Sequence, residues 1–213
     1  MPKLDIFPED HMHFAYGLFL LKPSHPLIRK MRKSIRPNLF GQKTWASSFL
    51  AIDYLQEHPL PKQSKVLELG CGWAPIAVYC AQQGCKATGM DIDEQVFPYM
   101  DVLANTNDVK VKALHSSFAE LSPKQLAKFD ALVGADICFW ENLIDELMAM
   151  FERAQEAGVQ QIIIADPGRS TFSQLCDACE ATWPNAFSHS YWYSLEPNRA
   201  EGQVLHLDFR HRR

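Results

Sequence analysis

Short, mostly apolar runs alternate with longer amphipathic runs along most of this chain. The short runs span four to six residues, and each is followed by a run in which apolar positions recur at helical spacing. The short runs predict strands at 65–69, 86–90, 109–114, 130–133 and 161–165. The amphipathic runs predict helices at 45–56, 76–83, 94–105, 123–128, 143–157 and 172–182. Since strands that alternate with helices form right-handed crossovers, we expect a parallel sheet with helices on both faces.

The end of the chain departs from this alternation. Residues 187–195 and 203–209 both have strand character, and the turn-rich segment 196–202 joins them without an intervening helix. Two strands joined in this way pair as an antiparallel hairpin. The pattern therefore predicts a Rossmann-like α/β fold, in which five parallel strands and a C-terminal antiparallel hairpin form one seven-stranded sheet.

The first forty residues show no comparable periodicity. Prolines interrupt any long element there, at Pro2, Pro8, Pro23, Pro26 and Pro37. We expect this part to be irregular. The sequence predicts an N-terminal extension over 1–43 and one domain over 44–213.

Composition narrows the classes of protein to consider. The chain has 213 residues, 47% hydrophobic and 22% charged, which is the balance of a globular domain. The net charge of −4 gives no global basic field, so nucleic acid is not a favoured partner. One local exception is the basic run 29–36, which is either a solvated helix face or a partner contact. No apolar stretch reaches the roughly 18 residues of a membrane span, so we expect no membrane association.

The cysteines indicate the compartment of the protein, and neither the cysteines nor the histidines have the spacing of metal ligands. Several of the six cysteines lie in apolar runs, where reduced thiols behave as small hydrophobes, so we expect a cytoplasmic protein. Cys176 and Cys179 form a lone C-x-x-C without a second pair at ligand spacing. His115, His189 and His206 show no ligand spacing either. We predict no metal site.

A glycine-rich turn follows the first predicted strand of the domain. It reads Glu68-Leu69-Gly70-Cys71-Gly72. Gly70 and Gly72 allow a sharp turn and a close approach of a ligand to the backbone. A pyrophosphate site would favour a third glycine where Pro75 stands, and proline removes a backbone donor. This disfavours a dinucleotide.

Two carboxylates bracket the turn. Glu68 precedes the first glycine, and Asp91 ends the second strand, 19 residues after Gly72. Acids suit a cationic ligand better than a diphosphate. Glu68 is suited to the amino group and sulfonium of S-adenosylmethionine, and Asp91 to both ribose hydroxyls. Three alternatives stay open: Glu68 caps the next helix, Asp91 is an ordinary turn acid, or Asp93 takes the ribose.

These residues carry a specific resemblance. The segment 66–72 is similar to motif I of the class I S-adenosylmethionine-dependent methyltransferases, and Asp91 matches their second-strand acid. Ala74 stands where their third small residue is often glycine. The order of strands, with a terminal hairpin, also resembles the layout of that class. Such a resemblance implies S-adenosylmethionine as the cofactor.

Three further segments resemble the methyltransferase-like protein-lysine methyltransferases. Residues 41–48 are similar to the tryptophan-bearing segment of that family. Residues 135–140 resemble its Asp-x-x-Tyr motif, with Phe139 in place of the tyrosine. Residues 166–169 resemble a segment found in the relatives of that family that modify the electron-transfer flavoprotein β-subunit. The resemblance covers about residues 41–169.

The resemblance and the strand ends together define a candidate site. The candidate cofactor-binding residues are Trp45, Glu68, Gly70, Cys71, Gly72, Asp91, Ser117, Phe118 and Asp136. The candidate catalytic residues are Asp136, Phe139 and Trp140. Asp136 would orient an acceptor amine and receive its proton, and the two aromatics would line a channel for a cation.

Each assignment has a structural alternative. Trp45 is either a wall over the cofactor or part of the core. Asp136 either points at the transferring methyl group or caps the helix that begins near Glu141. Phe139 and Trp140 either line a channel for the acceptor or belong to the hydrophobic core. Arg169 either anchors an acidic group near the site or forms a surface salt bridge.

The leading function is methylation of a lysine side chain in a protein substrate. Methylation of a small molecule on nitrogen or oxygen is the alternative, and a non-catalytic module that binds S-adenosylmethionine is a third reading. Residues 136–139 lack the Asn/Asp-Pro-Pro-aromatic run of many enzymes that methylate nucleic-acid bases. The sequence does not define the oligomeric state.

Overall fold

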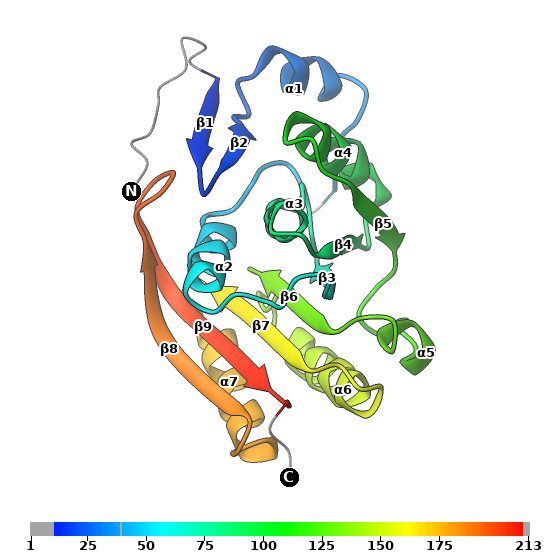
Figure 1. Ribbon diagram of the computed structural model, residues 1–213, viewed down its shortest axis with the longest axis vertical. Coiled ribbons are helices and arrows are strands. Elements are labelled where there is room, and N and C mark those ends of the chain that lie inside the picture. Colours follow the sequence, from blue (N-terminus) through cyan, green and yellow to red (C-terminus); the bar gives the residue numbers. More distant parts are fainter. Residues whose placement is uncertain (1–10, 39, 211–213) are drawn as a thin grey trace.

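A seven-stranded sheet forms the centre of the computed structural model, which describes residues 11–38 and 40–210. Its strand order is β5-β4-β3-β6-β7-β9-β8 (Figure 1). The parallel strands are β3 (Lys65–Leu69), β4 (Lys86–Asp91), β5 (Val111–His115), β6 (Ala131–Ala135) and β7 (Gln161–Asp166). The hairpin strands β8 (Phe187–Ser194) and β9 (Ala200–Asp208) are antiparallel, and β9 pairs with β7. The predicted fold is confirmed.

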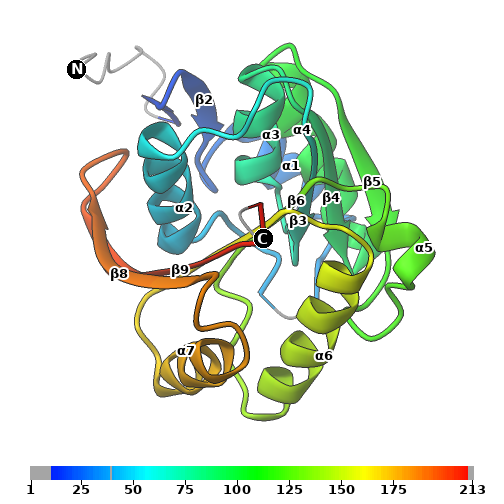
Figure 2. The ribbon, with the colours of Figure 1, turned by 60° about the horizontal axis from the view of Figure 1, so that its bottom comes forward.

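Helices cover both faces of the sheet, because each helix has an apolar stripe that must be buried. The helices of the main domain are α2 (Ala46–Glu57), α3 (Pro75–Gln82), α4 (Phe97–Thr106), α5 (Pro123–Leu126), α6 (Asn142–Glu156) and α7 (Ser170–Thr182), with the 3₁₀ helix η1 (Glu94–Val96) before α4. Figure 2 shows α2, α3 and α4 on one side of the sheet and α6 and α7 on the other. Two clusters of buried side chains, one per face, form the core.

The N-terminal segment has regular structure, so the prediction of an irregular segment is wrong. Strands β1 (Met12–Ala15) and β2 (Leu18–Leu21) form a hairpin, and α1 (Pro26–Met31) follows. Tyr16 and Gly17 have φ of +57° and +77°, the left-handed pair that a two-residue hairpin turn requires. Pro26 lies in the first turn of α1, where its missing N–H is harmless. Proline there starts an element instead of preventing one. Pro2 and Pro8 lie outside the described residues.

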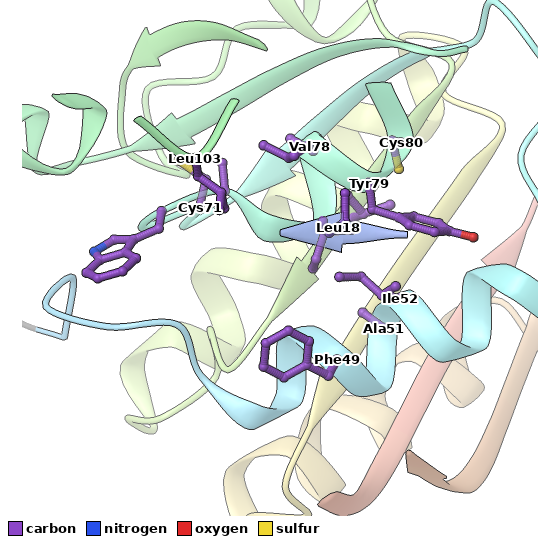
Figure 3. Close-up of a cluster of buried hydrophobic side chains, with 14 of the residues drawn as sticks. Leu18, Phe49, Ala51, Ile52, Cys71, Val78, Tyr79, Cys80 and Leu103 are labelled. Carbon is purple, nitrogen blue, oxygen red and sulfur yellow. The ribbon is translucent and has the colours of Figure 1, made fainter. Parts of the chain in front are cut away.

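The hairpin packs on the main domain. Leu18 is fully buried in the same cluster as Ile52 and Tyr79, as Figure 3 shows. The Gln82 side chain donates to the Gly17 carbonyl at 2.7 Å, and the Asn107 side chain accepts from a β2 amide at 2.7 Å. The described part of 11–43 thus shares its core with the rest, and the division at residue 43 stays a prediction.

Element boundaries differ from the predicted ones at a few places. Strand β5 begins two residues late, because the Val109 amide donates to the Ala104 carbonyl and closes α4. Strand β9 begins three residues early, at Ala200. Gly202 allows this, since a Cβ there would lie 2.3 Å from the Asp166 carbonyl oxygen of β7. Within the described ranges, every helix is too short or too polar to cross a membrane.

Candidate active site

A cavity of about 320 Å³ opens at the carboxyl ends of β3, β4 and β6. The chain runs from β3 outward to β4 and β5 and then returns to β6, so the cavity lies where the strand order reverses. Open α/β sheets bind ligands at this point. Every residue of the sequence-predicted site lines the cavity. The structure therefore brings the candidate residues together, while their individual roles stay predictions.

The glycine turn has the backbone conformation that its sequence predicts. Gly70 and Gly72 have φ of +57° and +51°. A Cβ at Gly70 would lie 2.9 Å from Ile137 Cγ2, whereas a Cβ at Gly72 would meet nothing within 4 Å. Gly70 is therefore needed for packing and Gly72 leaves free space on the cavity side. Ala74 also has positive φ, +56°, and α3 begins at Pro75, one residue before the predicted start.

Glu68 is buried, with 2% of its surface exposed. Its Oε2 accepts a hydrogen bond from the Ala77 amide at 2.6 Å, within the first turn of α3. Burial raises the pKa of this carboxyl to about 8, and the amides of α3 only partly oppose the shift. Glu68 thus makes the hydrogen bond to the start of α3 that its alternative role as a helix cap predicts. The role of Glu68 toward a cationic ligand stays a prediction.

Asp91 fixes the turn and still has capacity to bind a ligand. Its Oδ2 accepts from the Gly72 amide at 2.9 Å, and its Oδ1 accepts from the Asp93 amide at 3.0 Å. Burial raises its pKa. A carboxylate has about four acceptor positions, so about two remain for hydroxyl donors. Asp93 also lines the cavity, and its carboxylate caps η1 through the Gln95 amide.

The segment after β5 forms the next wall. Ser117 and Phe118 line the cavity, and so does the buried Ser116, which the sequence reading missed. The Ser117 amide and hydroxyl both donate to the Glu120 carboxylate at 3.0 Å. These two hydrogen bonds lower the pKa of Glu120. The Ser117 amide is therefore already paired within its own loop, and the role of Ser117 toward the cofactor stays a prediction.

Asp136 sits in a strained, tightly held position. Its φ is +63°, and its amide donates to the Ala165 carbonyl at 2.9 Å. Its carboxylate forms an ion pair with Arg169, and the same guanidinium contacts the fully buried Asp166 at 2.9 Å. The N-cap of α6 is Glu141, so the alternative that Asp136 caps this helix is wrong. Of the two alternatives for Arg169, anchoring of an acidic group near the site or a surface salt bridge, the structure shows the first.

Aromatic side chains gather at the mouth of the cavity. Ring centroids lie 4.7 Å apart for Phe139 and Trp140, 5.1 Å for Phe40 and Phe139, and 5.9 Å for Phe40 and Trp45. Trp140 is 49% exposed, while Phe139 and Trp45 are half-buried. None of the three is core, so that alternative is wrong for each.

Two further residues of the mouth were missed by sequence reasoning. The Lys43 ammonium lies 4.1 Å from the Trp45 ring centroid, and Glu146 of α6 contributes a carboxylate to the wall. Lys43 lies two residues before the tryptophan of the segment 41–48 that carried the family resemblance. Nothing in the spacing of Glu146 distinguished it from other acids on a solvated helix face.

Comparisons with known proteins identify a methyltransferase-like region in this chain. A family model described as a methyltransferase domain matches residues 66–158. The ribosomal protein L11 methyltransferase of Thermus thermophilus is 34% identical over 125 residues, which cover 58% of this chain and 45% of that protein. The chain thus spans less than half of that relative.

Solved structures share the fold. An S-adenosylmethionine-dependent methyltransferase from Agrobacterium tumefaciens has a TM-score of 0.61 at 13% identity, over 82% of this chain and 70% of that one. The magnesium protoporphyrin IX methyltransferase of Synechocystis, solved with bound S-adenosylmethionine, has a TM-score of 0.51 at 18% identity, over 84% and 88%. The chain therefore has the fold of S-adenosylmethionine-dependent methyltransferases, and its residues 66–158 match the methyltransferase-domain model.

The residues fit the cofactor of this class. The cavity volume lies within the range of small-molecule sites, roughly 300–1,000 Å³. Gly72 leaves room beside the turn, and Asp91 keeps acceptor positions for two hydroxyls. S-adenosylmethionine would be held by these residues, with Phe118 and Ile92 as apolar walls.

Proposed function

We propose that the chain transfers a methyl group from S-adenosylmethionine to the ε-amino group of a lysine in a protein substrate. One observation carries the proposal: an ammonium group of the chain, that of Lys43, already lies against the Trp45 ring at the cavity mouth. An aromatic face attracts a lysine cation. A substrate lysine offers the same chemistry, and the neighbouring rings of Phe40 and Phe139 extend the surface.

Carboxylates complement this aromatic surface. Asp136 and Glu146 both line the cavity. Two acids attract a cationic side chain and disfavour an anionic acceptor. The relative from Thermus thermophilus is named as a methyltransferase of a ribosomal protein, which supports a protein as the substrate here.

The chain must supply alignment, exclusion of water and removal of a proton. When bound, S-adenosylmethionine supplies an electrophilic methyl group on a cationic sulfur. A free lysine has a pKa near 10.4, so its ammonium group must lose a proton before it can attack the methyl group. Arg169 holds the Asp136 carboxylate in one orientation. Asp136 Oδ2 accepts a long hydrogen bond of 3.5 Å from the Ser47 hydroxyl. This oxygen can orient the amine and receive its proton directly or through water.

The test is incubation of the chain with radiolabelled S-adenosylmethionine and a cell lysate. We expect label in a protein band, and N-methyl-lysine after acid hydrolysis of that band. Label confined to the small-molecule fraction would support the alternative of a small-molecule acceptor. A lack of label in any fraction, with intact cofactor binding, would support the non-catalytic module.

A Trp45→Leu variant sharpens the test. It removes the aromatic face while keeping an apolar side chain, so we expect the Michaelis constant for the protein substrate to rise. Tyr193→Leu, which removes an exposed aromatic ring of β8 outside the cavity, is the control and should leave that constant unchanged.

We also propose a cytoplasmic setting. All six cysteines have free thiols, and burial raises the pKa of Cys71 and Cys80 well above the ordinary value. Unreactive reduced thiols suit a reducing compartment.

A further inference from the structure

A second hollow lies away from the proposed active site. It is a groove of about 1010 Å³ that spans the starts of β3, β4 and β5 and the end of α5. Five exposed lysines line it: Lys65, Lys86, Lys110, Lys112 and Lys128. We call it the lysine groove. Because these strands are parallel, it lies at the opposite end of them from the cavity.

The strands hold three of these lysines in a row. Lys65 of β3 is the register partner of Lys86 of β4. Lys110 directly precedes Val111, the register partner of Ala87, so it continues the row on the next strand. Adjacent strands are about 4.8 Å apart, and like charges directly opposite one another are destabilising.

Acids near the row leave its ammonium groups unpaired within the described ranges, and Asp130 accepts only the Lys65 backbone amide, at 2.7 Å. The ammonium groups of all five lysines lack a hydrogen bond or ion pair to a carboxylate there. Asp108 is the single acid of the groove wall. This concentration of positive charge contrasts with the net charge of −4 for the whole chain.

Protection of the sheet edge explains only part of the pattern. β5 is an edge strand, and lysines on such strands discourage association of sheets. That accounts for Lys110 and Lys112. It does not account for Lys65 and Lys86, which begin the interior strands β3 and β4 (Figure 1). Charge complementarity therefore indicates an anionic partner.

The chemistry of the groove favours an acidic protein segment over nucleic acid. Single-stranded nucleic acids usually stack on several aromatic rings, and Phe129, itself packed against the core, is the one aromatic side chain in this wall. The edge of β5 leaves backbone N–H and C=O groups on its outer side, which an extended peptide can pair with.

We propose that the lysine groove binds an acidic, extended segment of a partner protein. The carboxylates of the segment face the row of lysines, and its backbone runs beside β5. The site is separate from the proposed active site and needs no cofactor.

The test is fluorescence anisotropy with the full chain and a labelled glutamate decamer. The double variant Lys86→Glu/Lys110→Glu reverses two charges in the row, and Lys30→Glu/Lys33→Glu makes the same change in net charge at exposed lysines of the N-terminal segment. We expect the first variant to weaken binding at least about tenfold and the second less than about twofold. Lys86→Arg/Lys110→Arg should bind like wild type.

Three results would overturn the proposal. They are equal weakening in both charge-reversal variants, no binding of the peptide by wild type at low salt, or tighter binding of an oligouridine of the same length. Binding of S-adenosylhomocysteine should be unchanged in every variant. That control separates the groove from the active site, so failure here leaves the proposed methyl transfer intact.

Discussion

The Glu68 carboxyl shows how one residue serves structure and chemistry at once. It is buried at the base of the cavity and accepts the Ala77 amide, so it fixes the start of α3. Burial favours its neutral form, because charge in an apolar interior is unfavourable. A cation bound beside it would lower its pKa again. We therefore predict that Glu68 couples the helix start to the charge of the ligand.

A pH dependence of stability follows. The pKa of Glu68 is about 8 in the folded chain, against an ordinary value of 4.5. Between these values the folded state keeps a proton that the unfolded state has lost. The stabilisation is complete below pH 4.5, and the free energy of unfolding should then fall by up to about 1.4 kcal/mol per pH unit until pH 8.

Glu68→Gln isolates this effect, since an amide oxygen can accept from Ala77 but does not titrate. Chemical denaturation of both proteins across the window should show a steeper fall with pH in wild type. His206, whose pKa burial lowers to about 4, titrates in both proteins, so its contribution cancels in the difference. Parallel pH profiles would show that the Glu68 carboxyl is ionised in the folded chain.

Gly72 allows a second prediction at this scale. Gly72→Ala places a methyl group in the free space beside the turn. Gly84→Ala, the control, places a methyl group in open space at the end of α3. Both have positive φ, so each change should cost about 1–2 kcal/mol of stability. Only Gly72→Ala should weaken binding of S-adenosylhomocysteine, by at least about tenfold in calorimetry. Equal affinities in the two variants would remove the turn from the cofactor site.

At the scale of elements, Arg169 joins the loops that follow β6 and β7. Its guanidinium contacts Asp136, which directly follows β6, and Asp166, the last residue of β7. The Thr171 hydroxyl donates to the Cys138 carbonyl and adds a second link. The aromatic residues 139 and 140 continue directly from the first loop. Their position therefore depends on contacts between two separate crossovers.

Arg169→Ala should disrupt this link. It leaves the buried Asp166 without its cationic partner, so we expect a loss of about 1.5–3 kcal/mol in the free energy of unfolding. Turnover should fall more than affinity for S-adenosylhomocysteine, because the misplaced groups face the acceptor. Arg199→Ala is the control, since Arg199 pairs with the exposed Glu201, and it should change neither quantity. Unchanged turnover in a folded Arg169→Ala protein would contradict this role.

The sequence predicted the elements of the main domain because each buries a clear apolar face. It missed the hairpin of β1 and β2, whose strands have four residues each and whose turn carries Tyr16 instead of the usual Asn or Asp. In the site, strand-end acids and glycines could be predicted from chain position. The places of Lys43 and Glu146 at the cavity could not, because the folded sheet alone brings them to it. For Arg169 the sequence left two alternatives, and the fold decided between them.

At the scale of the whole molecule, charge is distributed unevenly. Carboxylates gather at the carboxyl ends of the parallel strands, and lysines gather at their amino ends. The net charge of −4 is a sum over the whole chain, so it does not reveal either of these two charged regions. A protein substrate with a lysine for the cavity and an acidic segment for the groove would complement both ends of the sheet.

The central claim is that the turn and its acids bind the adenosyl cofactor of methyl transfer, and calorimetric titration with S-adenosylhomocysteine, its demethylated form, tests it most directly. We predict binding to wild type, no binding of NADH, and a loss of about 1.5–3 kcal/mol in Asp91→Ala, the range for a hydrogen bond to a charged group. Asp93→Ala should have a smaller effect. Unchanged affinity in a folded Asp91→Ala protein, or binding of NADH in place of S-adenosylhomocysteine, would contradict the account.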